Sequence, residues 1–491
     1  MEHTTCNTKD EVGLKKVIVW FRKDLRLHDN PALWEAAQQG AIIPVFVWSE
    51  QEELDYATSE TARWWLHHSL MSLERELESH GLNLIIRKGS SFEQLMLICG
   101  QTKADAVYFN ERYEPSIISR DRTIAGKLLS CVSEVQSFSS NLLFTPEKML
   151  NQKNEPYKVF TSFWKRSMRE SVNYPLPIPP SIIPYNEALP SLQVKELGLL
   201  PNKPWHDKFH TYWEPGEKGA ISRWQQFVDE GLVHYAKESD IPSADAVSSL
   251  SAHLVWGDIS VRSIWHAAKR LRDGKSDEYR QSSIDAFLRQ LVWREFAYHQ
   301  LIHFPTMLNE PLREKFKEFP WLNHEEELEK WQKGLTGYPL VDAGMRELWE
   351  TGVIHNRVRM VVASFLVKHL LVTWLEGSKW FQETLVDFDP ANNAIGWQWV
   401  AGTGIDASPY FRVFNPILQS QKFDSDGLYI RRWIPELAEL PAPYIHEPWK
   451  APEHILTEAK IVLGETYPLP IVEHSIARQR ALEAYGEIKN S

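Results

Sequence analysis

Short apolar runs alternate with longer amphipathic stretches over the first quarter of the chain. The apolar runs are rich in β-branched and aromatic residues, as buried strands are, and lie at 16–21, 41–48, 82–88 and 106–110. The stretches between them carry apolar residues at three- and four-residue spacing and predict helices at 31–39, 59–80, 92–99 and 116–130. This alternation predicts an N-terminal α/β domain over 14–136, built on an open, doubly wound parallel sheet.

The first helix has clear boundaries in the sequence. Asn30 is a good N-cap, Pro31 suits the first helical position, and Gly40 follows the last helical residue. The preceding turn, 22–30, reads RKDLRLHDN and contains no GxGxxG, so a dinucleotide site is not expected there.

Both periodicities are lost between 137 and 205, where prolines and scattered polar residues predict a long interdomain connector. Apolar residues return at helical spacing beyond this segment and predict an all-α C-terminal domain over 206–485. The clearest helical stretches are 222–228, 284–301, 341–350 and 355–375.

Composition narrows the class of protein. The net charge of −11 argues against a protein that coats nucleic acid or membranes by bulk charge, although a local basic groove stays possible. Cys6, Cys99 and Cys131 are too few for a disulfide framework or a four-cysteine metal site, so we expect no metal and a reducing compartment, the cytoplasm. Residues 1–11 lack a signal-peptide pattern, and the most apolar stretch, 360–375, is too short and polar for a membrane span.

Three stretches of the helical region hold polar side chains that a hydrophobic core does not need: 340–374, 387–399 and 401–433. Each has a simple structural explanation, namely a solvated helix start, an Asp389-Pro390 helix cap and a turn-rich basic surface. Together they offer carboxylates, amides and an arginine for a large heteroaromatic cofactor, aromatic walls, and arginines for phosphates. Neither a hydrolase triad nor a zinc-ligand spacing is present.

Four motifs closely resemble the photolyase/cryptochrome family, in order and with matching spacing over about 16–480. They are WFRKDLRLHDNPAL (20–33), GYPLVDAGMREL (337–348), HNRVRMVVASFLVKHLL (355–371) and GWQWVAGTGIDASPYFRVFNP (396–416). The resemblance implies a flavin photoenzyme, with FAD held in the helical domain and an electron passed to a flipped-out pyrimidine dimer.

The resemblance also implies which residues hold FAD. They are Tyr235, Val247, Ser248, Ser249, Leu250, Ser251, Phe287, Arg294, Asn356, Arg359, Asp387, Asp389 and Asn393. An Arg359–Asp387 pair beside the ring suits a reduced, anionic flavin, because the cation is itself partly balanced. The alternative for this pair is a purely structural buried salt bridge.

Asn393 falls where the family places the residue that faces flavin N5, and asparagine there is typical of repair enzymes. Trp397, Trp374 and Trp321 match the family's electron-transfer triad, although each of the three is also a plausible core residue.

The resemblance implies a DNA lesion pocket as well. Trp293 and Trp399 would form its walls, Met360 would lie beneath the lesion, and a flipped base needs such aromatic walls. The expected DNA-binding set is Gln290, Trp293, Asn356, Arg357, Met360, Trp399, Arg412 and Gln419. Met360 favours cyclobutane dimers, since (6-4) photolyases usually carry a histidine in this region.

Three departures from the family pattern bear on DNA. Gln290 stands where cyclobutane-dimer enzymes usually have glutamate, so we expect repair of reduced efficiency. The family's TSRLS run appears as VSSLS at 247–251, and Ser239 replaces a common arginine, which predicts weaker DNA binding.

Details such as WEPGEKGA (213–220) resemble the bacterial class III photolyases. By analogy, the α/β domain is expected to carry an antenna chromophore, with methenyltetrahydrofolate preferred. Its identity is left open, because Ser116-Ile117 replaces the Asn-Glu pair of class I enzymes.

The sequence therefore predicts a monomeric, cytoplasmic, FAD-dependent enzyme that repairs cyclobutane pyrimidine dimers in UV-damaged DNA. A cryptochrome photoreceptor is the leading alternative. This alternative is supported by Gln290, Val247, Ser239 and Ser249. It is opposed by Asn393, Met360 and Trp293, and by the absence from this sequence of the long signalling tail that many cryptochromes have. A (6-4) photolyase and a flavin-free helical DNA-binding protein are the remaining alternatives.

Overall fold

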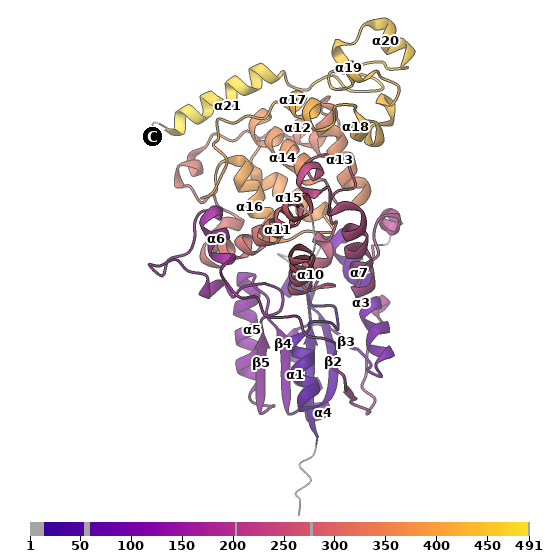
Figure 1. Cartoon of the computed structure of the whole chain (residues 1–491), viewed down its shortest axis with the longest axis vertical. Coiled ribbons are helices and arrows are strands. Elements are labelled where there is room, and N and C mark those ends of the chain that lie inside the picture. Colours follow the sequence, from indigo (N-terminus) through magenta and orange to yellow (C-terminus); the bar gives the residue numbers. More distant parts are fainter. Residues whose placement is uncertain (1–13, 54–58, 202–203, 275–277, 490–491) are drawn as a thin grey trace, which may run out of the picture.

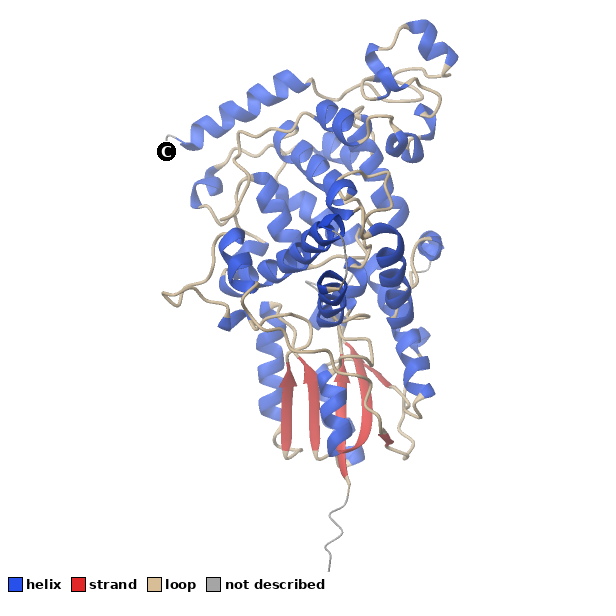
Figure 2. Cartoon of the chain, viewed as in Figure 1, coloured by secondary structure: helices blue, strands red, loops and turns tan. Residues whose placement is uncertain are grey.

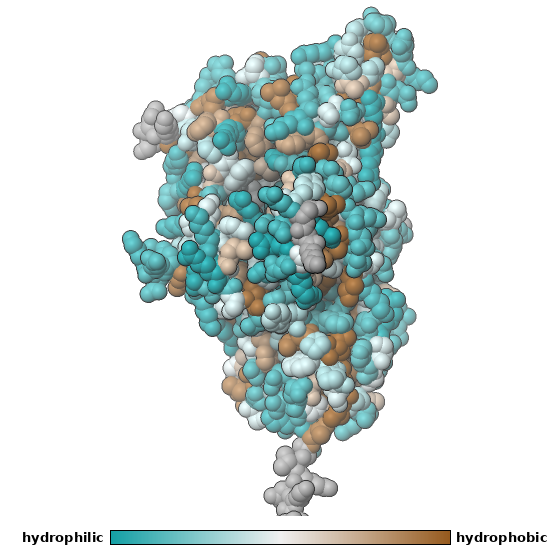
Figure 3. All heavy atoms as spheres, viewed as in Figure 1, coloured by the Kyte–Doolittle hydropathy of each residue, from teal (hydrophilic) through white to brown (hydrophobic). Residues whose placement is uncertain are grey.

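The structure is a computed structural model that describes residues 14–53, 59–201, 204–274 and 278–489. Cys6 and the segment used to judge a signal peptide lie outside the described residues. A sheet-containing domain and a helical domain stack along the long axis of the molecule (Figure 1, Figure 2). No described helix is long and apolar enough to cross a membrane, and the face shown in Figure 3 is mostly hydrophilic.

The N-terminal domain is a parallel sheet with strand order β3-β2-β1-β4-β5. Its elements are β1 (Lys15–Phe21), α1 (Pro31–Gln39), β2 (Gly40–Trp48), α2 (Glu50–Glu53), α3 (Glu60–Ser79), β3 (Ile85–Lys88), α4 (Ser91–Thr102), β4 (Ala106–Asn110), α5 (Pro115–Leu128) and β5 (Glu134–Phe138). The Asn30 cap is confirmed, since its Oδ1 accepts a hydrogen bond from the Leu33 amide at 3.2 Å.

Alternate residues of β1 enter two separate cores, because successive side chains of a strand point to opposite faces. Val17, Val19 and Phe21 pack with α1 and α3, whereas Ile18 and Trp20 pack with α4 and α5. Helices therefore cover both faces of the sheet, which confirms the predicted doubly wound domain.

The C-terminal domain is helical, as predicted. Its elements are α7 (Glu217–Gln226), α8 (Tyr235–Glu238), α9 (Ser251–Trp256), α10 (Val261–Asp273), α11 (Glu278–His303), α12 (Glu325–Gln332), α13 (Pro339–Thr351), α14 (Asn356–Ser364), α15 (Trp374–Thr384), α16 (Pro390–Ala401), α17 (Pro416–Phe423), α18 (Leu428–Trp433), α19 (Ala442–Ile445), α20 (Glu453–Glu458) and α21 (His474–Lys489). Its largest core joins α13, α14, α15 and α16.

The prediction of one helical stretch over 355–375 is wrong. Helix α14 passes into a π-helical turn, Phe365–His369, and the helix then ends. Leu371 has φ +55°, and the Thr373 hydroxyl caps a new helix, α15, by accepting from the Leu375 amide at 3.4 Å. Apolar periodicity could not show this break, because the intervening residues are themselves apolar and buried.

The segment 137–205 contains more regular structure than its lack of periodicity predicted. Helix α6 (Phe160–Ser167) packs on α11, and β6 (Ile183–Pro184) pairs with β2. Strand β5 was not predicted and runs past the expected boundary at 136. It lies at the edge of the sheet and has no fully buried residue, so its apolar pattern is weak.

The turn between β1 and α1 joins the two domains. The Asp29 carboxylate is fully buried and accepts hydrogen bonds from Arg262 Nε at 2.9 Å and Nη2 at 2.7 Å. Glu217 of α7 accepts from the backbone amides of Leu27 at 2.9 Å and His28 at 3.1 Å. A Cβ on Gly257 would lie 2.2 Å from the carbonyl oxygen of Lys23, so the helical domain meets this turn at backbone contact.

Substitution of Arg262 by alanine leaves the Asp29 carboxylate buried without its ionic partner. We expect Arg262→Ala to lower the free energy of unfolding by about 3–5 kcal/mol, because the remaining carboxylate would be a buried charge without an opposite charge beside it. Denaturant titration measures this loss. Lys330→Ala, which removes an exposed partner of Glu326, should change it by less than about 0.5 kcal/mol. Equal effects of both variants would contradict the importance of the buried pair.

Candidate functional site

Helix α16 lies at the centre of the helical domain and contacts α11, α14 and α15. One stripe of this central helix is nevertheless accessible. Asn392, Asn393 and Trp399 are only half-buried, and Gly396 is exposed. A Cβ added to Gly396 would meet no atom within 4 Å, so open space borders this position of α16. A side chain here would occupy room that a bound molecule can use.

Several predicted cofactor residues gather on one side of this stripe. Tyr235, Leu250 and Phe287 belong to a single apolar cluster with Ile395 of α16. The Tyr235 and Phe287 rings meet edge to face at 5.7 Å between centroids. The run 247–251 leads into α9 with Val247 and Ser251 exposed and Ser249 at φ +50°.

Arg359 of α14 is fixed from two directions. Its Nη2 donates to both carboxylate oxygens of Asp387 at 2.8 and 2.9 Å, and its Nε donates to the Ile354 carbonyl at 2.8 Å. The Asp387 side chain is buried, whereas the Arg359 side chain keeps 27% of its surface exposed. Among the described residues no partner takes Nη1, so this edge of the cation is available.

Asp389 has a structural explanation. Its Oδ1 accepts from the Asn392 amide at 2.8 Å and caps α16, and its Oδ2 accepts from the Tyr298 hydroxyl at 2.6 Å. Burial, with the Asp389 carboxylate next, raises the pKa of Tyr298 well above its ordinary value. Both carboxylate oxygens therefore hold the start of α16 in place.

The Asn393 amide has a defined orientation. Its Nδ2 donates to the Ser378 hydroxyl at 2.9 Å and to the Ser378 carbonyl at 3.2 Å, both on α15. The donor side of the amide therefore faces α15, and Oδ1 is left as an acceptor. Ser378 was missed in the sequence, because nothing in a helical pattern marks a serine that orients an asparagine on another helix.

Arg294 reaches the domain interface. Its Nη1 donates to the Asn141 carbonyl at 2.8 Å and pairs with Glu295 at 3.3 Å. Burial raises the pKa of Glu295 to about 7, against the opposing effect of Arg294. These contacts tie α11 to the segment that follows β5.

Of the three tryptophans of the expected triad, Trp374 begins α15, Trp397 lies on α16, and Trp321 precedes α12. Trp397 and Trp374 are each only 2% exposed, and Trp321 is half-buried. The Trp397 ring packs directly on Gly377, one turn from Trp374. A hydrogen bond from the Leu322 amide to the Leu371 carbonyl, at 2.8 Å, brings the segment of Trp321 next to the break before α15. Exposure thus increases from Trp397 toward Trp321.

Trp293 of α11 stacks on Phe160 of α6, with centroids 3.5 Å apart and ring planes within 6°. Phe160 lies in the segment 137–205, which was predicted to be a connector without periodicity, so this stacking was not predicted. Gln290 and Asn356 are exposed, and Met360 and Trp399 are half-buried. These four side chains remain accessible to a ligand.

The expected DNA-contacting cation Arg357 is already engaged. It pairs with Asp240 at 2.5 Å, and its guanidinium lies 4.4 Å from the centroid of the Phe423 ring. Arg412 is exposed, Gln419 is half-buried, and both lie beside the largely exposed side chains of Phe411 and Leu418. Asp240 and Arg357 are 117 residues apart in the chain, so no local sequence pattern indicated that they form a pair.

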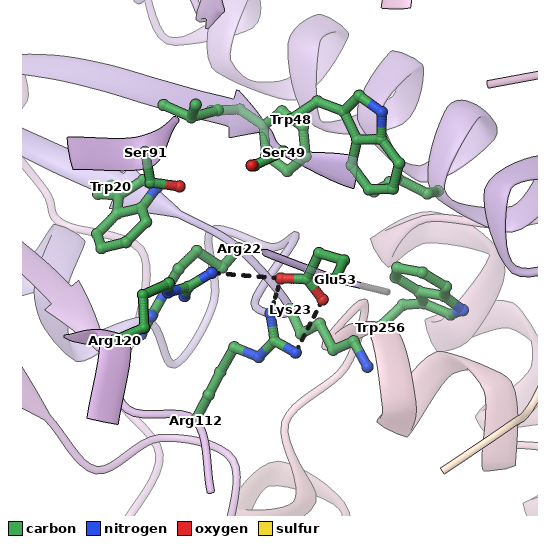
Figure 4. A pocket seen from close by; sticks show the side chains of 13 residues that line it. Trp20, Arg22, Lys23, Trp48, Ser49, Glu53, Ser91, Arg112, Arg120 and Trp256 are labelled. Carbon is green, nitrogen blue, oxygen red and sulfur yellow. Dashed lines mark hydrogen bonds and ion pairs between the residues drawn. The ribbon is translucent and has the colours of Figure 1, made fainter. Parts of the chain in front are cut away.

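A second candidate site lies at the carboxyl ends of β1 and β2, beneath Trp256 of the helical domain. The pocket has a cavity volume of about 30 Å³ and opens to solvent. Its lining includes Trp20, Arg22, Lys23, Trp48, Glu53, Arg112, Arg120 and Trp256. Figure 4 shows the Glu53 carboxylate facing Arg112, with which it forms two hydrogen bonds.

Comparisons with known proteins match these features. A family model described as "DNA photolyase" matches residues 17–181, and one described as "FAD binding domain of DNA photolyase" matches residues 287–487. A deoxyribodipyrimidine photo-lyase of Agrobacterium fabrum is 45% identical over 97% of this chain and 98% of its own length. The chain belongs to the photolyase and cryptochrome family.

Two further members illustrate the range of this family. Cryptochrome-2 of Arabidopsis thaliana is 38% identical over 97% of this chain and 80% of its own length. The crystal structure of a bacterial class III photolyase from Agrobacterium tumefaciens superposes with a TM-score of 0.94 at 43% identity, covering 99% of this chain and all of that one.

The helical domain has features that suit a bound flavin. The accessible stripe of α16 offers room for a ligand. Among the described residues, Arg359, held by Asp387, has one free guanidinium edge, and Asn393, held by Ser378, has a free amide oxygen. Trp397 Nε1 is buried with no hydrogen-bond partner within the described part of the chain. A flat, polar-edged molecule against α16 suits this combination better than a packed core does.

Gly377 is required by the Trp397 ring, because an added Cβ would lie 2.1 Å from it. We expect Gly377→Ala to displace that ring and to lower the free energy of unfolding by about 1–3 kcal/mol. Gly126→Ala is the matched control: this glycine is exposed on α5 with no atom within 4 Å of an added Cβ. The free energy of unfolding of this control, measured by thermal or denaturant unfolding, should instead rise by about 0.5–1 kcal/mol. A stabilised Gly377→Ala variant would disprove the close packing.

Proposed function

We propose that this protein repairs cyclobutane pyrimidine dimers in DNA with the energy of blue light. The observation that carries the proposal is that the contacting helices α14 and α16 each present a polar side chain held by a neighbour, Arg359 by Asp387 and Asn393 by Ser378. The relative of 45% identity is named deoxyribodipyrimidine photo-lyase, and the similarity extends over both domains. Met360, accessible on α14, favours the cyclobutane dimer over the (6-4) lesion.

When bound, FAD in its fully reduced form supplies the light-excited electron that opens the cyclobutane ring. Arg359 presents its free guanidinium edge to the anionic ring, while Asp387 keeps the cation in place. Asn393 accepts a hydrogen bond at Oδ1 without adding a negative charge. The hydroxyls and amides of 247–251 serve the phosphates and ribose, with Tyr235 and Phe287 packed behind them.

Trp397, Trp374 and Trp321 form the proposed relay that reduces oxidised flavin. Their exposure rises from the buried pair to Trp321, which suits electron entry from solvent. The lesion pocket is proposed between Trp293, backed by Phe160, and Trp399, with Gln290 available to hydrogen-bond the extruded bases.

The pocket below Trp256 is the proposed antenna site. Trp20, Trp48 and Trp256 provide aromatic surfaces, whereas the cations of the lining are each paired with a carboxylate: Arg22 with Asp121, Lys23 with Glu114, Arg112 with Glu53, and Arg120 with Glu52. Methenyltetrahydrofolate is the proposed chromophore by analogy with the class III photolyases, and its acidic groups would have to replace some of these carboxylates as partners of the cations. Monomeric state and a cytoplasmic location remain part of the proposal.

A cryptochrome-type photoreceptor is the second candidate, and one specific observation favours it. Asp240 neutralises Arg357 on the proposed DNA face, and Ser239 and Ser249 stand where the family pattern has cations. DNA affinity is therefore the property that separates the two functions.

Repair is tested by illuminating the photoreduced protein with an oligonucleotide that carries one thymine cyclobutane dimer. We expect thymine absorbance to return in blue light and not in darkness. Gln290→Glu should raise the quantum yield, because a carboxylic acid can also donate a proton to the reduced dimer. If an antenna is bound, the same reaction should also be driven by light at wavelengths that the reduced flavin itself absorbs only weakly. A yellow, photoreducible protein without light-dependent recovery would refute repair and favour a photoreceptor.

Asp240→Asn should strengthen DNA binding by releasing Arg357 to a phosphate. We expect the slope of log affinity against log salt to steepen by about one phosphate contact. Fluorescence anisotropy of a labelled dimer-containing duplex at several salt concentrations measures this slope. Glu78→Gln, at an exposed position of α3 in the other domain, makes the same change in net charge and should leave it unaltered. Equal shifts in both variants would show that the change in net charge, and not the release of Arg357, causes the effect.

A further inference from the structure

His355 is the N-cap of α14, the helix that carries four of the proposed site residues. Its Nδ1 accepts a hydrogen bond from the Arg357 amide at 3.2 Å, with His355 at φ −55° and ψ 136°. Histidine seldom serves as an N-cap, because Ser, Thr, Asp and Asn reach the free amides more easily. The imidazole must be neutral here, since Nδ1 can accept only without a proton, which places the ring proton on Nε2.

The residues that depend on this cap follow directly. Asn356, Arg357 and Arg359 lie in the first turn, and Met360 follows directly after it. Arg359 also binds the carbonyl of Ile354, the residue before the cap, so its direction follows the entry of the chain into α14. Without the cap, the Arg357 amide would have no partner, and the side chain of Arg359 would keep only its contacts with Asp387 and Ile354.

The surroundings oppose a charge on His355. Its side chain lies at the positive end of a helix, and Arg357 and Arg359 are on the same turn. Burial lowers the pKa of His355 to about 4, and both arginines act in the same direction. Asp240 and the backbone carbonyl of Ser239 act against them. Glu347 contacts the backbone of His355: its carboxylate accepts a hydrogen bond from the His355 amide at 3.1 Å. The same carboxylate accepts from the Tyr429 hydroxyl at 2.5 Å.

We propose that neutral His355 is the positioning residue of the flavin and lesion site, and that its protonation releases the first turn of α14. The inference rests on the proposed function, since it concerns how that same site is held. Protonated Nδ1 cannot accept from the Arg357 amide, and an imidazolium repels both arginines. The released turn no longer holds Asn356 and Arg359 toward the flavin or Arg357 and Met360 toward DNA.

The direction of the pH effect follows from the lowered pKa. A histidine that is neutral in the fold and has an ordinary pKa of 6.5 when released contributes its full effect above that value. The contribution is lost as the pH falls from 6.5 toward 4. FAD retention and repair should therefore decline together over this range.

Three variants of the FAD-loaded protein test the proposal. His355→Asn keeps a capping oxygen that does not titrate near neutral pH, whereas His355→Ala removes the cap. His324→Ala is the matched control, because His324 occupies the N-cap position of α12 with no side-chain capping bond. Equilibrium dialysis gives the FAD dissociation constant of each, and dimer repair is followed from pH 7.5 to 5.

We expect His355→Ala to bind FAD about fivefold more weakly at pH 7.5, the factor that corresponds to loss of one cap. His355→Asn should match the wild type at pH 7.5 and retain FAD at pH 5 better than the wild type does. His324→Ala should behave as the wild type throughout. An acid decline of His355→Asn identical to that of the wild type, or unchanged binding in His355→Ala, would overturn the proposal.

The FAD measurement separates this inference from the proposed function. If His355→Asn flattens the pH dependence of FAD retention while no variant repairs dimers, His355 positions the flavin site as proposed and the repair function is refuted. If dimers are repaired but the variants bind FAD alike at every pH, repair stands and the positioning role of His355 is refuted.

Discussion

The buried ion pair between Asp29 and Arg262 is the interaction on which the arrangement of the two domains depends. It joins the turn after β1 to the start of α10 with two charge-assisted hydrogen bonds. Glu217 binds the same turn through two backbone amides, and Gly257 allows the chains to meet without a side chain between them. Such a polar interface holds only in one register, because a shift leaves buried charges unpaired. The run 247–251, which leads into α9, and Trp256, the last residue of α9, take their positions from this junction.

The proposed flavin site follows a related principle. Two polar side chains of the proposed site are each held by another group: Arg359 by Asp387, and Asn393 by Ser378. Side chains fixed in this way need little reorganisation when a charged ring binds or changes its charge. The helices themselves are set by N-caps, Asp389 for α16 and His355 for α14. Local capping chemistry therefore controls the geometry of the whole site.

Sequence patterns were sufficient for features that depend on local chemistry. The Asn30 cap and the alternation of strands with helices are examples. The Arg359–Asp387 pair, 28 residues apart, was predicted only by resemblance to a family. Sequence patterns were insufficient where long-range contacts decide the structure. Strand β5 takes its place from pairing with β4, and the stacking of Phe160 on Trp293 joins two segments far apart in the chain. The Asp240–Arg357 pair was invisible for the same reason, although it bears directly on DNA affinity.

The most direct test of the central claim is the excited-state lifetime of the fully reduced flavin in the intact protein. If the site passes an electron to a dimer held between Trp293 and Trp399, an oligonucleotide with one cyclobutane thymine dimer should shorten the emission lifetime. The same oligonucleotide without damage should leave the lifetime unchanged. Equal lifetimes with damaged and undamaged DNA, at concentrations where both are bound, would contradict electron transfer to the lesion.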